Sequence, residues 1–271
     1  MPELPEVETT RLGLVPSLPG KTVTRVTVRE SRLRSPVDEN LPQLLAGHSL
    51  RAITRRAKYL LFRFDHGTLL AHLGMTGTLR LLPPDTPAGK HDHVDILFGD
   101  TLMRFNDPRR FGALVWVEGD PACHPLLSHL GPEPLEREFD ADYLYRMTRT
   151  RSAAIKLVIM DAKVVVGVGN IYASESLYRA GIRPQKAARR LTRPQCAALV
   201  EAIRDTLRDA LAAGGSTLRD FFNADGSPGY FQQSYFVYDR AGHPCRRCDA
   251  TIKHLTQGQR SSYYCPQCQK P

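Results

Sequence analysis

The sequence predicts an α+β protein with a β-rich N-terminal part, a helical part and a metal-bound hairpin near its C-terminal end. Three observations predict this order. Short alternating runs of apolar and polar residues fill about residues 21–117, the pattern turns helical after a Pro-rich stretch, and two Cys-x-x-Cys pairs follow. The chain has 271 residues, which suggests two domains of roughly 100–200 residues each.

The β-rich part contains five clear runs separated by turn residues. Many short strands at this spacing favour an antiparallel sandwich or barrel. Residues 65–67 and 98–100 are predicted to form hairpin turns, and a short helix is expected before the strands, from about residue 3 to residue 14. The five predicted strands are 22–29, 58–64, 76–82, 93–98 and 113–117.

The second half of the chain has the spacing of helices. Residues 131–134, Gly-Pro-Glu-Pro, are typical of a linker. Thr192 and Gln195 then form a predicted capping box, and Gly214 supplies a stop about twenty residues later. Two further helices are expected, at 152–161 and 170–180.

The charge balance indicates a polyanion as partner. The chain has 37 Lys and Arg against 28 Asp and Glu, a net charge of +9, and its pI is near 9.4. Such a basic protein often binds nucleic acid, although a basic protein with a solvated surface has the same composition. No apolar run is long enough to span a membrane, and the first residues lack the pattern of a signal peptide, so we expect a protein that stays inside the cell.

Four cysteines near the C-terminal end have the spacing of a zinc site. Cys245 and Cys248 form one pair, and Cys265 and Cys268 form the second pair. Two such pairs supply four thiolates to one tetrahedral zinc ion, which leaves no open position for catalysis. The alternative is a redox pair, but that predicts a single motif beside a βαβ unit. We therefore expect one structural zinc ion.

Two segments of the helical half suit a phosphate. Residues 167–170, Gly-Val-Gly-Asn, precede a predicted helix and present backbone N–H groups to an anion. The third glycine of a dinucleotide motif is missing, since Tyr172 occupies its place. Lys253 and Arg260 lie between the two cysteine pairs, where they suit a DNA or RNA backbone. An ordinary helix entry and a zinc hairpin with a solvated basic face are the alternatives.

The N-terminus introduces a catalytic hypothesis. Initiator Met1 precedes Pro2, so its removal exposes a proline amine. A chain-terminal amine has a pKa of about 7.7–8.0 against about 10.4 for Lys, so more of it is a neutral nucleophile at pH 7. Glu3 and Glu6 follow and could relay protons. The alternative, favoured by the residues alone, is an acidic first helical turn that interacts well with the helix dipole.

Several segments together resemble the formamidopyrimidine-DNA glycosylases, bacterial enzymes that excise oxidised purines. The resemblance spans essentially the whole chain, and its motifs are highly specific when they occur together in this order. It implies a β-sandwich over 1–130, a linker at 131–136, a helix–two-turns–helix domain over 137–235 and a zinc finger over 236–271. The segments are 1–8, 55–59, 72–75, 90–93, 107–112, 131–134, 167–175 and the cysteine pairs.

The resemblance implies a bifunctional DNA glycosylase and abasic-site lyase that acts by β,δ-elimination. Pro2 is the implied nucleophile at the sugar C1′, and Glu3 is the implied acid that helps to open the deoxyribose ring. Lys58 is implied as acid and base in elimination. Arg260 is implied in the second elimination and in gripping the phosphate of the flipped nucleotide.

The resemblance also implies a set of DNA contacts. Met75 and Phe111 would fill the space that a flipped nucleotide leaves, and Arg109 would contact the orphaned partner base, preferably cytosine. The alternative places Met75 and Phe111 in the core and Arg109 on the surface, but the glycines beside them favour turns. The remaining implied contacts are His91, Arg151 (where some relatives carry Lys) and Asn170.

The expected partner is double-stranded DNA with an oxidised base, bound by a monomer in the cytoplasm, at the nucleoid, without membrane contact. An endonuclease VIII-like glycosylase for oxidised pyrimidines is the nearest alternative; Leu4 and the segment 108–111 favour the purine enzyme. A non-catalytic zinc-ribbon DNA-binding protein is the alternative from another class, and it would need no free Pro2 amine. Residues 216–231 are expected either to close over the lesion base or to be a plain connector.

Overall fold

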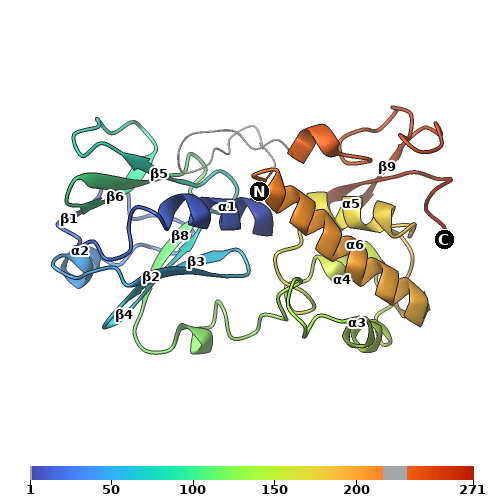
Figure 1. Ribbon diagram of the computed structural model, residues 1–271, viewed down its shortest axis with the longest axis horizontal. Helices are drawn as coiled ribbons and strands as arrows, with labels where there is room; N and C mark the ends of the chain where they lie inside the picture. Colours follow the sequence, from blue (N-terminus) through green and yellow to red (C-terminus); the bar gives the residue numbers. More distant parts are fainter. Residues whose placement is uncertain (1, 216–230) are drawn as a thin grey trace. The chain divides into compact units, whose positions relative to one another are not determined.

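The computed structural model describes residues 2–215 and 231–271, and the chain divides into two compact units (Figure 1). The N-terminal unit comprises residues 1–128 with 213–230, and the C-terminal unit comprises 129–212 with 231–271. The first unit is therefore built from two separate stretches of chain. The residues of the Pro-rich stretch pack within the second unit, where Gly131 N donates to Ala162 O at 2.8 Å. The predicted domain limits stay predictions.

The N-terminal unit contains two four-stranded sheets, and all of their strand pairs are antiparallel. The predicted β-sandwich is confirmed. One sheet has the order β1 (Arg25–Val28), β6 (Asp92–Phe98), β7 (Thr101–Asn106) and β5 (Thr78–Leu82). The other sheet has the order β2 (Ala52–Arg56), β3 (Tyr59–Phe64), β4 (Gly67–His72) and β8 (Ala113–Val117).

All five predicted strands are present, but three more had no clear signal. β4 is buried along nearly its whole length, so its side chains do not alternate between apolar and polar. β2 and β7 were missed because charged residues interrupt them. The hairpin turns at 65–66 and 99–100 lie where the sequence predicts them, and Gly99 has the positive φ of 64° that such a turn needs.

Helix α1 (Leu4–Leu14) opens the N-terminal unit as predicted, and the short α2 (Leu41–Leu45) follows β1. α1 lies against the second sheet, where Arg11 Nη1 donates to Ile53 O at 3.3 Å. Leu4, Val7 and Leu14 form its buried face. The core of the unit joins α1 to both sheets through, among others, Val7, Leu14, Leu45, Leu60, Phe62, Val94, Phe98, Phe105 and Leu114.

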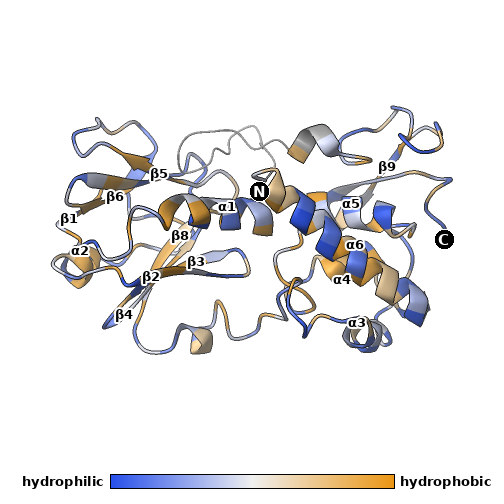
Figure 2. Cartoon of the chain, viewed as in Figure 1, coloured by the Kyte–Doolittle hydropathy of each residue, from blue (hydrophilic) through white to orange (hydrophobic). Residues whose placement is uncertain are grey.

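The C-terminal unit begins with four helices. The predicted capping box is confirmed at the start of the longest one, since Thr192 N donates to Gln195 Oε1 at 3.1 Å and Gln195 N donates to Thr192 Oγ1 at 3.4 Å. Apolar and polar residues alternate along this helix, α6, in Figure 2. α4 is shorter than the predicted 152–161, and α3 was not predicted. The helices are α3 (Ala141–Thr148), α4 (Ile155–Ile159), α5 (Asn170–Arg179) and α6 (Arg193–Ala212).

The C-terminal hairpin pairs β9 (Lys253–Gln257) with β10 (Arg260–Tyr264). Its two-residue turn is Gly258-Gln259, and both residues have positive φ. Tyr178 of α5 joins the hairpin's small core, together with Val237, Cys245, Ile252 and Cys265. None of the described helices is both long and apolar enough to cross a lipid bilayer.

Candidate functional site

The first residues of the chain are buried where α1 begins. Pro2 and Glu3 lie directly before the helix, and Glu3 is 2% exposed. Glu6 is fully buried, and its carboxylate accepts a hydrogen bond from Glu3 N at 2.8 Å. Helix capping therefore accounts for Glu6. Glu3 is the N-cap residue of the same capping box, as the alternative of an acidic helix start expects, so the catalytic roles of Pro2 and Glu3 stay predictions.

Lys58 lies in the turn between β2 and β3. The preceding residue, Ala57, has a φ of 55°, an uncommon conformation for a residue with a side chain. Arg55 holds the turn, since its Nη1 donates to Ala57 O at 2.9 Å and its Nε donates to Glu8 Oε2 at 3.0 Å. One arginine thus connects the turn that carries Lys58 to the helix that follows Pro2 and Glu3.

His72 ends β4 and lies opposite Tyr59, with the two ring centroids 4.8 Å apart. Burial, together with the positive charges of Lys58 and Arg34, lowers the pKa of His72 to about 4. The neutral ring accepts a hydrogen bond from Gly74 N at its Nδ1, at 3.0 Å. Sequence reasoning missed Arg34, because its loop meets Gly112 only in the folded sheet, where Arg34 N donates to Gly112 O.

Met75 and Phe111, the apolar side chains predicted to fill the space that a flipped nucleotide leaves, are exposed. Met75 is 37% and Phe111 is 44% exposed, and they are two of the three large hydrophobic side chains exposed among the described residues. Both lie in turns, and the Arg109 guanidinium stands 4.8 Å from the centre of the Phe111 ring. The alternative that Met75 and Phe111 are core residues is wrong. His91 lies near the same turns, because its carbonyl accepts from Asp107 N at 3.1 Å.

In the C-terminal unit, the buried side chain of Lys156 connects two predicted DNA contacts. Its Nζ donates to Asn170 Oδ1 and to Ser261 O, both at 2.6 Å, and to Ser262 Oγ at 2.8 Å. Asn170 is the first residue of α5, and Arg260 immediately precedes Ser261. Because its oxygen accepts from Lys156, the Asn170 amide keeps its NH₂ group as a donor, which suits a phosphate. The sequence signal for Lys156 is a lysine within an apolar helical run.

The two predicted phosphate-binding arginines of this unit differ in their surroundings. Arg260 is exposed and forms no salt bridge within residues 2–215 and 231–271. Arg151 is about one-third exposed, and its Nη1 lies 3.1 Å from Asp161 Oδ2. A phosphate would therefore share Arg151 with a carboxylate, which the sequence did not indicate.

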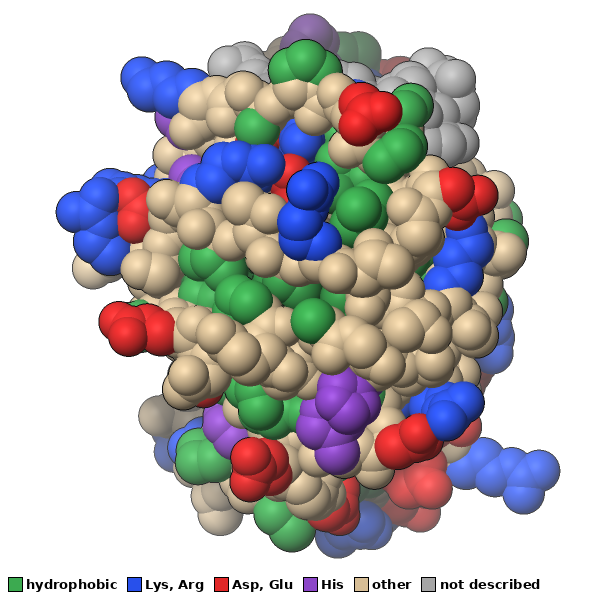
Figure 3. Space-filling model, turned by 90° about the vertical axis from the view of Figure 1, so that its left-hand side faces the viewer, with side chains coloured by type: hydrophobic (Ala, Val, Ile, Leu, Met, Phe, Trp, Pro, Cys, Tyr) green, Lys and Arg blue, Asp and Glu red, His purple; other side chains and the backbone are tan. Residues whose placement is uncertain are grey.

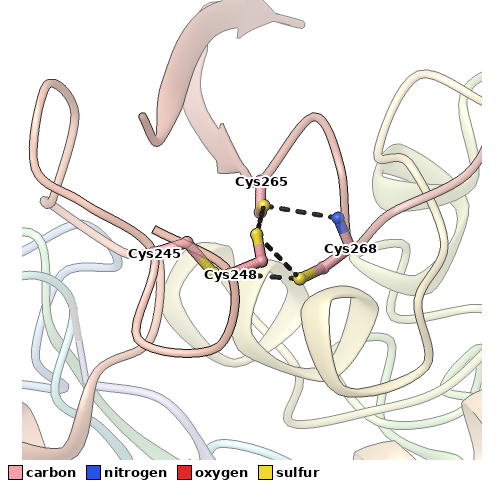
Figure 4. A group of neighbouring side chains, drawn as sticks. All are labelled: Cys245, Cys248, Cys265 and Cys268. Carbon is pink, nitrogen blue, oxygen red and sulfur yellow. Dashed lines mark hydrogen bonds between the residues drawn. The ribbon is translucent and has the colours of Figure 1, made fainter. Parts of the chain in front are cut away.

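The four cysteines converge at one point (Figure 4). Their sulfurs lie within 4.8 Å of one another, and three of the separations are 3.4–3.8 Å. A tetrahedron with zinc–sulfur bonds of about 2.3 Å places the sulfurs about 3.8 Å apart, so the arrangement fits zinc. Tyr178 Oη lies 3.2 Å from Cys245 Sγ, and Arg247 N donates to the same sulfur at 3.4 Å. These contacts are of the kind that orient thiolate ligands.

Glu175 of α5 is a second buried charged residue that sequence reasoning missed. Its carboxylate accepts from three consecutive backbone N–H groups, those of Phe236, Val237 and Tyr238, at 2.8–3.0 Å. Burial raises the pKa of Glu175, and these hydrogen bonds oppose the rise. The side chain therefore fixes the segment that leads into the cysteine hairpin.

The positive charge of the protein is mixed with negative charge over part of the surface. Figure 3 shows one face on which Lys and Arg side chains are interspersed with Asp and Glu. Surface pairs of the N-terminal unit, such as Arg51 with Asp65 at 2.5 Å and Lys21 with Asp100 at 2.8 Å, have this character. Exposed pairs of this kind contribute little to stability.

Three family profiles match the chain in order. They describe the formamidopyrimidine-DNA glycosylase N-terminal domain at residues 1–114, the H2TH domain of that enzyme at 130–222, and a zinc finger found in FPG and IleRS at 242–271. A formamidopyrimidine-DNA glycosylase of Thioalkalivibrio sulfidiphilus is 58% identical over the full length of both chains. The chain belongs to the formamidopyrimidine-DNA glycosylase family. Membership confirms the predicted family, the enzyme class and the structural zinc.

Two solved structures of the family are similar to the whole chain. One is a variant of the Lactococcus lactis FPG in complex with DNA that contains Fapy-dG. It is 34% identical, with a TM-score of 0.93 and full coverage of both chains. The other is MutM in complex with DNA that contains carbocyclic 8-oxo-G, also 34% identical with full coverage and a TM-score of 0.91. The fold of this formamidopyrimidine-DNA glycosylase family member is thus shared along its entire length.

Proposed function

We propose that this protein flips an oxidised purine out of duplex DNA, excises it and then cleaves the strand at the resulting abasic site. The observation that carries the proposal is the exposure of Met75 and Phe111, which with Leu12 are the exposed large apolar side chains among the described residues. An enzyme that acts on a base must remove it from the stack, and an apolar side chain can occupy the gap. The complexes of its relatives with Fapy-dG and 8-oxo-G DNA support an oxidised purine as substrate.

We propose Pro2 as the nucleophile. Its neutral amine attacks C1′, and the bond between C1′ and the base breaks with its electron pair on the base, which takes up a proton. Glu3 protonates O4′ as the sugar ring opens, and an iminium ion remains between the Pro2 nitrogen and C1′. The position of Glu3 supports this role, because it directly follows Pro2 and is buried beside it.

Strand cleavage follows from the iminium ion, which accepts electrons from the neighbouring carbon. Loss of a proton from C2′ expels the 3′ phosphate with the electron pair of its C–O bond, and loss of a proton from C4′ then expels the 5′ phosphate. We propose Lys58 as acid and base in the first elimination and Arg260 as a participant in the second. Water finally hydrolyses the iminium ion and restores the Pro2 amine.

We propose that Lys58, Arg151, Asn170 and Arg260 bind DNA phosphates, with His91 as a further DNA contact. The exposure of Arg260 supports its contact, and the Asn170 amide, whose oxygen accepts from Lys156, has its NH₂ group as the donor for a phosphate. Arg109 presents only donors, which suits an orphaned cytosine with acceptors at O2 and N3. The zinc ion supplies structural support to the hairpin that carries Arg260 and takes no part in the reaction.

Borohydride trapping tests the chemistry. Sodium borohydride should reduce the iminium ion on a duplex with one 8-oxoguanine and leave protein covalently bound to DNA, and peptide mapping should place the bond on Pro2. Protein that retains Met1 should not be trapped. An adduct on Lys58 would overturn the assignment. The same assay with an oxidised pyrimidine tests the endonuclease VIII-like alternative, which would require faster trapping on that duplex.

Glu3→Gln tests the proposed acid. Ring opening occurs during base removal, so the variant should lose more of its excision rate than of its cleavage rate at a pre-formed abasic site. Glu39→Gln is the matched control, because Glu39 is exposed in the same unit. Equal losses in both assays would count against the role.

The relatives are bacterial proteins, so we propose that this enzyme works as a monomer on the DNA of a bacterial cytoplasm. The suggested closure of residues 216–231 over the base concerns a segment of which 216–230 lie outside the described residues. The proposal therefore rests on the described residues alone.

A further inference from the structure

Asp107 lies at the centre of the turns that carry the predicted DNA contacts of the N-terminal unit. It follows β7 and is fully buried. One carboxylate oxygen accepts from the Thr76 hydroxyl at 2.5 Å, and the other accepts from Gly112 N at 2.7 Å. Its backbone N donates to His91 O at 3.1 Å. A single residue therefore bonds to three loops.

Thr76 lies in the same turn as Met75. Its hydroxyl donates to Asp107 and accepts from Arg109 N at 3.3 Å, so it connects the Met75 turn to the backbone of Arg109. The backbones of these turns also abut. A Cβ added to Gly74, whose φ is 65°, would come within 2.5 Å of Gly112 N. Neither turn can shift without moving the other.

The hydrogen-bond partners of the Asp107 carboxylate are neutral groups. Among the described residues, no Lys or Arg lies within ion-pair distance of its carboxylate. The carboxylate depends on two neutral donors, the Thr76 hydroxyl and the Gly112 amide. A buried carboxylate that loses one of its donors is strongly destabilised in that position. The Asp107 carboxylate thus couples the two turns, because their separation would remove one of its two hydrogen bonds.

We propose that Thr76 and Asp107 are positioning residues that lock the Met75 turn and the Arg109–Phe111 turn into one rigid element. With this element intact, Met75 fills the vacated space in the same movement that brings Arg109 to the orphaned base. The inference rests on the proposed function, since it assigns how base flipping and partner recognition are coupled. Neither residue touches the reacting atoms.

Thr76→Val tests the coupling, because valine keeps the shape of threonine and has a methyl group in place of the hydroxyl. We expect excision of 8-oxoguanine to fall about tenfold and the preference for cytosine over adenine as partner base to fall about fivefold or more, the range set by one lost buried hydrogen bond. Cleavage at a pre-formed abasic site should stay within about twofold. Thr76→Ser should restore all three values, since it keeps the hydroxyl.

Thr24→Val is the matched control, because Thr24 is an exposed residue of the same unit whose hydroxyl bonds to Leu97 O. It should behave as the unchanged protein. Fluorescence of 2-aminopurine placed opposite the lesion gives an independent readout of how the orphaned base is held. Thr76→Val should lower the change in that fluorescence on binding, and Thr76→Ser should not.

Retention of the full cytosine preference by Thr76→Val would overturn the coupling. Equal losses in excision, abasic-site cleavage and thermal stability would also overturn it, because they would show a purely structural residue. If the valine variant does not fold, Thr76→Ala serves for the same comparison. If neither variant folds while Thr76→Ser does, the hydroxyl has only a structural role, and the proposed coupling is wrong. Absence of any excision by the unchanged protein would instead contradict the proposed function.

Discussion

The two units hold their predicted DNA contacts by different means. In the N-terminal unit, Met75, Arg109 and Phe111 lie on turns that hydrogen bonds attach to a large sandwich core. In the C-terminal unit, Asn170 and Arg260 depend on Lys156 and on a hairpin that four cysteines hold. The comparison indicates that contacts next to a large apolar core can be held by hydrogen bonds to that core. Contacts next to a small core depend on a buried charge or on a metal site instead.

The cysteine hairpin has too few apolar residues to fold by burial alone. Its core cluster contains only five buried residues, and two of them are the ligands Cys245 and Cys265. Small modules of this kind need a metal or a disulfide to be stable. Buried charged groups such as Lys156 and Glu175 add a directional link where apolar packing cannot.

Removal of the zinc should have the largest effect, and this effect should be confined to the C-terminal unit. Cys265→Ser should abolish zinc binding, and because structural zinc sites contribute roughly 10–16 kcal/mol, strands β9 and β10 should unfold. Hydrogen exchange should show loss of protection there and unchanged protection in β3 and β4. Cys123→Ser, an exposed cysteine of the other unit, is the control. Fully active protein without zinc would contradict the structural role.

Loss of the buried lysine should have the next largest effect. Lys156→Met leaves Asn170 Oδ1, Ser261 O and Ser262 Oγ without their shared donor, so we expect the free energy of unfolding to fall by about 2–4 kcal/mol. Affinity for duplex DNA should fall with it. Lys163→Met is the control, since Lys163 is exposed in the same unit. Denaturant titration and DNA-binding isotherms measure both, and equal effects of the two variants would refute the prediction.

A pH titration examines the N-terminal unit. The folded pKa of His72 is about 4, below the usual value near 6.5, so only the unfolded chain takes up this proton between those pH values. Stability should therefore fall as the pH falls from about 6.5 to 4, by up to about 1.4 kcal/mol per pH unit from this group. His72→Asn keeps an acceptor for Gly74 N and should lose this dependence. An identical pH dependence in both proteins would show that His72 does not cause it.

The smallest expected effect concerns Arg151. Replacing it by Ala should make the slope of log K against log salt shallower by about 0.9 and weaken binding to damaged and undamaged DNA alike. Asp161→Asn removes its carboxylate partner and should tighten binding without lowering the slope. An unchanged slope in Arg151→Ala would identify an ordinary surface cation.

Local patterns of the sequence predicted the features that depend on neighbouring residues. Alternation gave the strand at 113–117 with its observed limits, the spacing of the cysteines gave the zinc site, and glycines marked the turns of Met75 and Phe111. The positioning groups could not be predicted in this way, because they join distant segments. Lys156 bonds to a residue 105 positions away, and Thr76 bonds to one 31 positions away.

Gly215 has a consequence for the order in which the protein is made. Its φ is 79°, and an added Cβ would lie 3.2 Å from Glu6 Oε1, so the chain returns to the start of α1 after the helical unit. On a ribosome that adds about 5–20 residues per second, Gly215 follows residue 128 by several seconds. During that interval the amino end of the nascent chain lacks this cover. Met1, whose removal the proposed nucleophile requires, can therefore be removed during these seconds, before the segment around Gly215 packs against the start of α1.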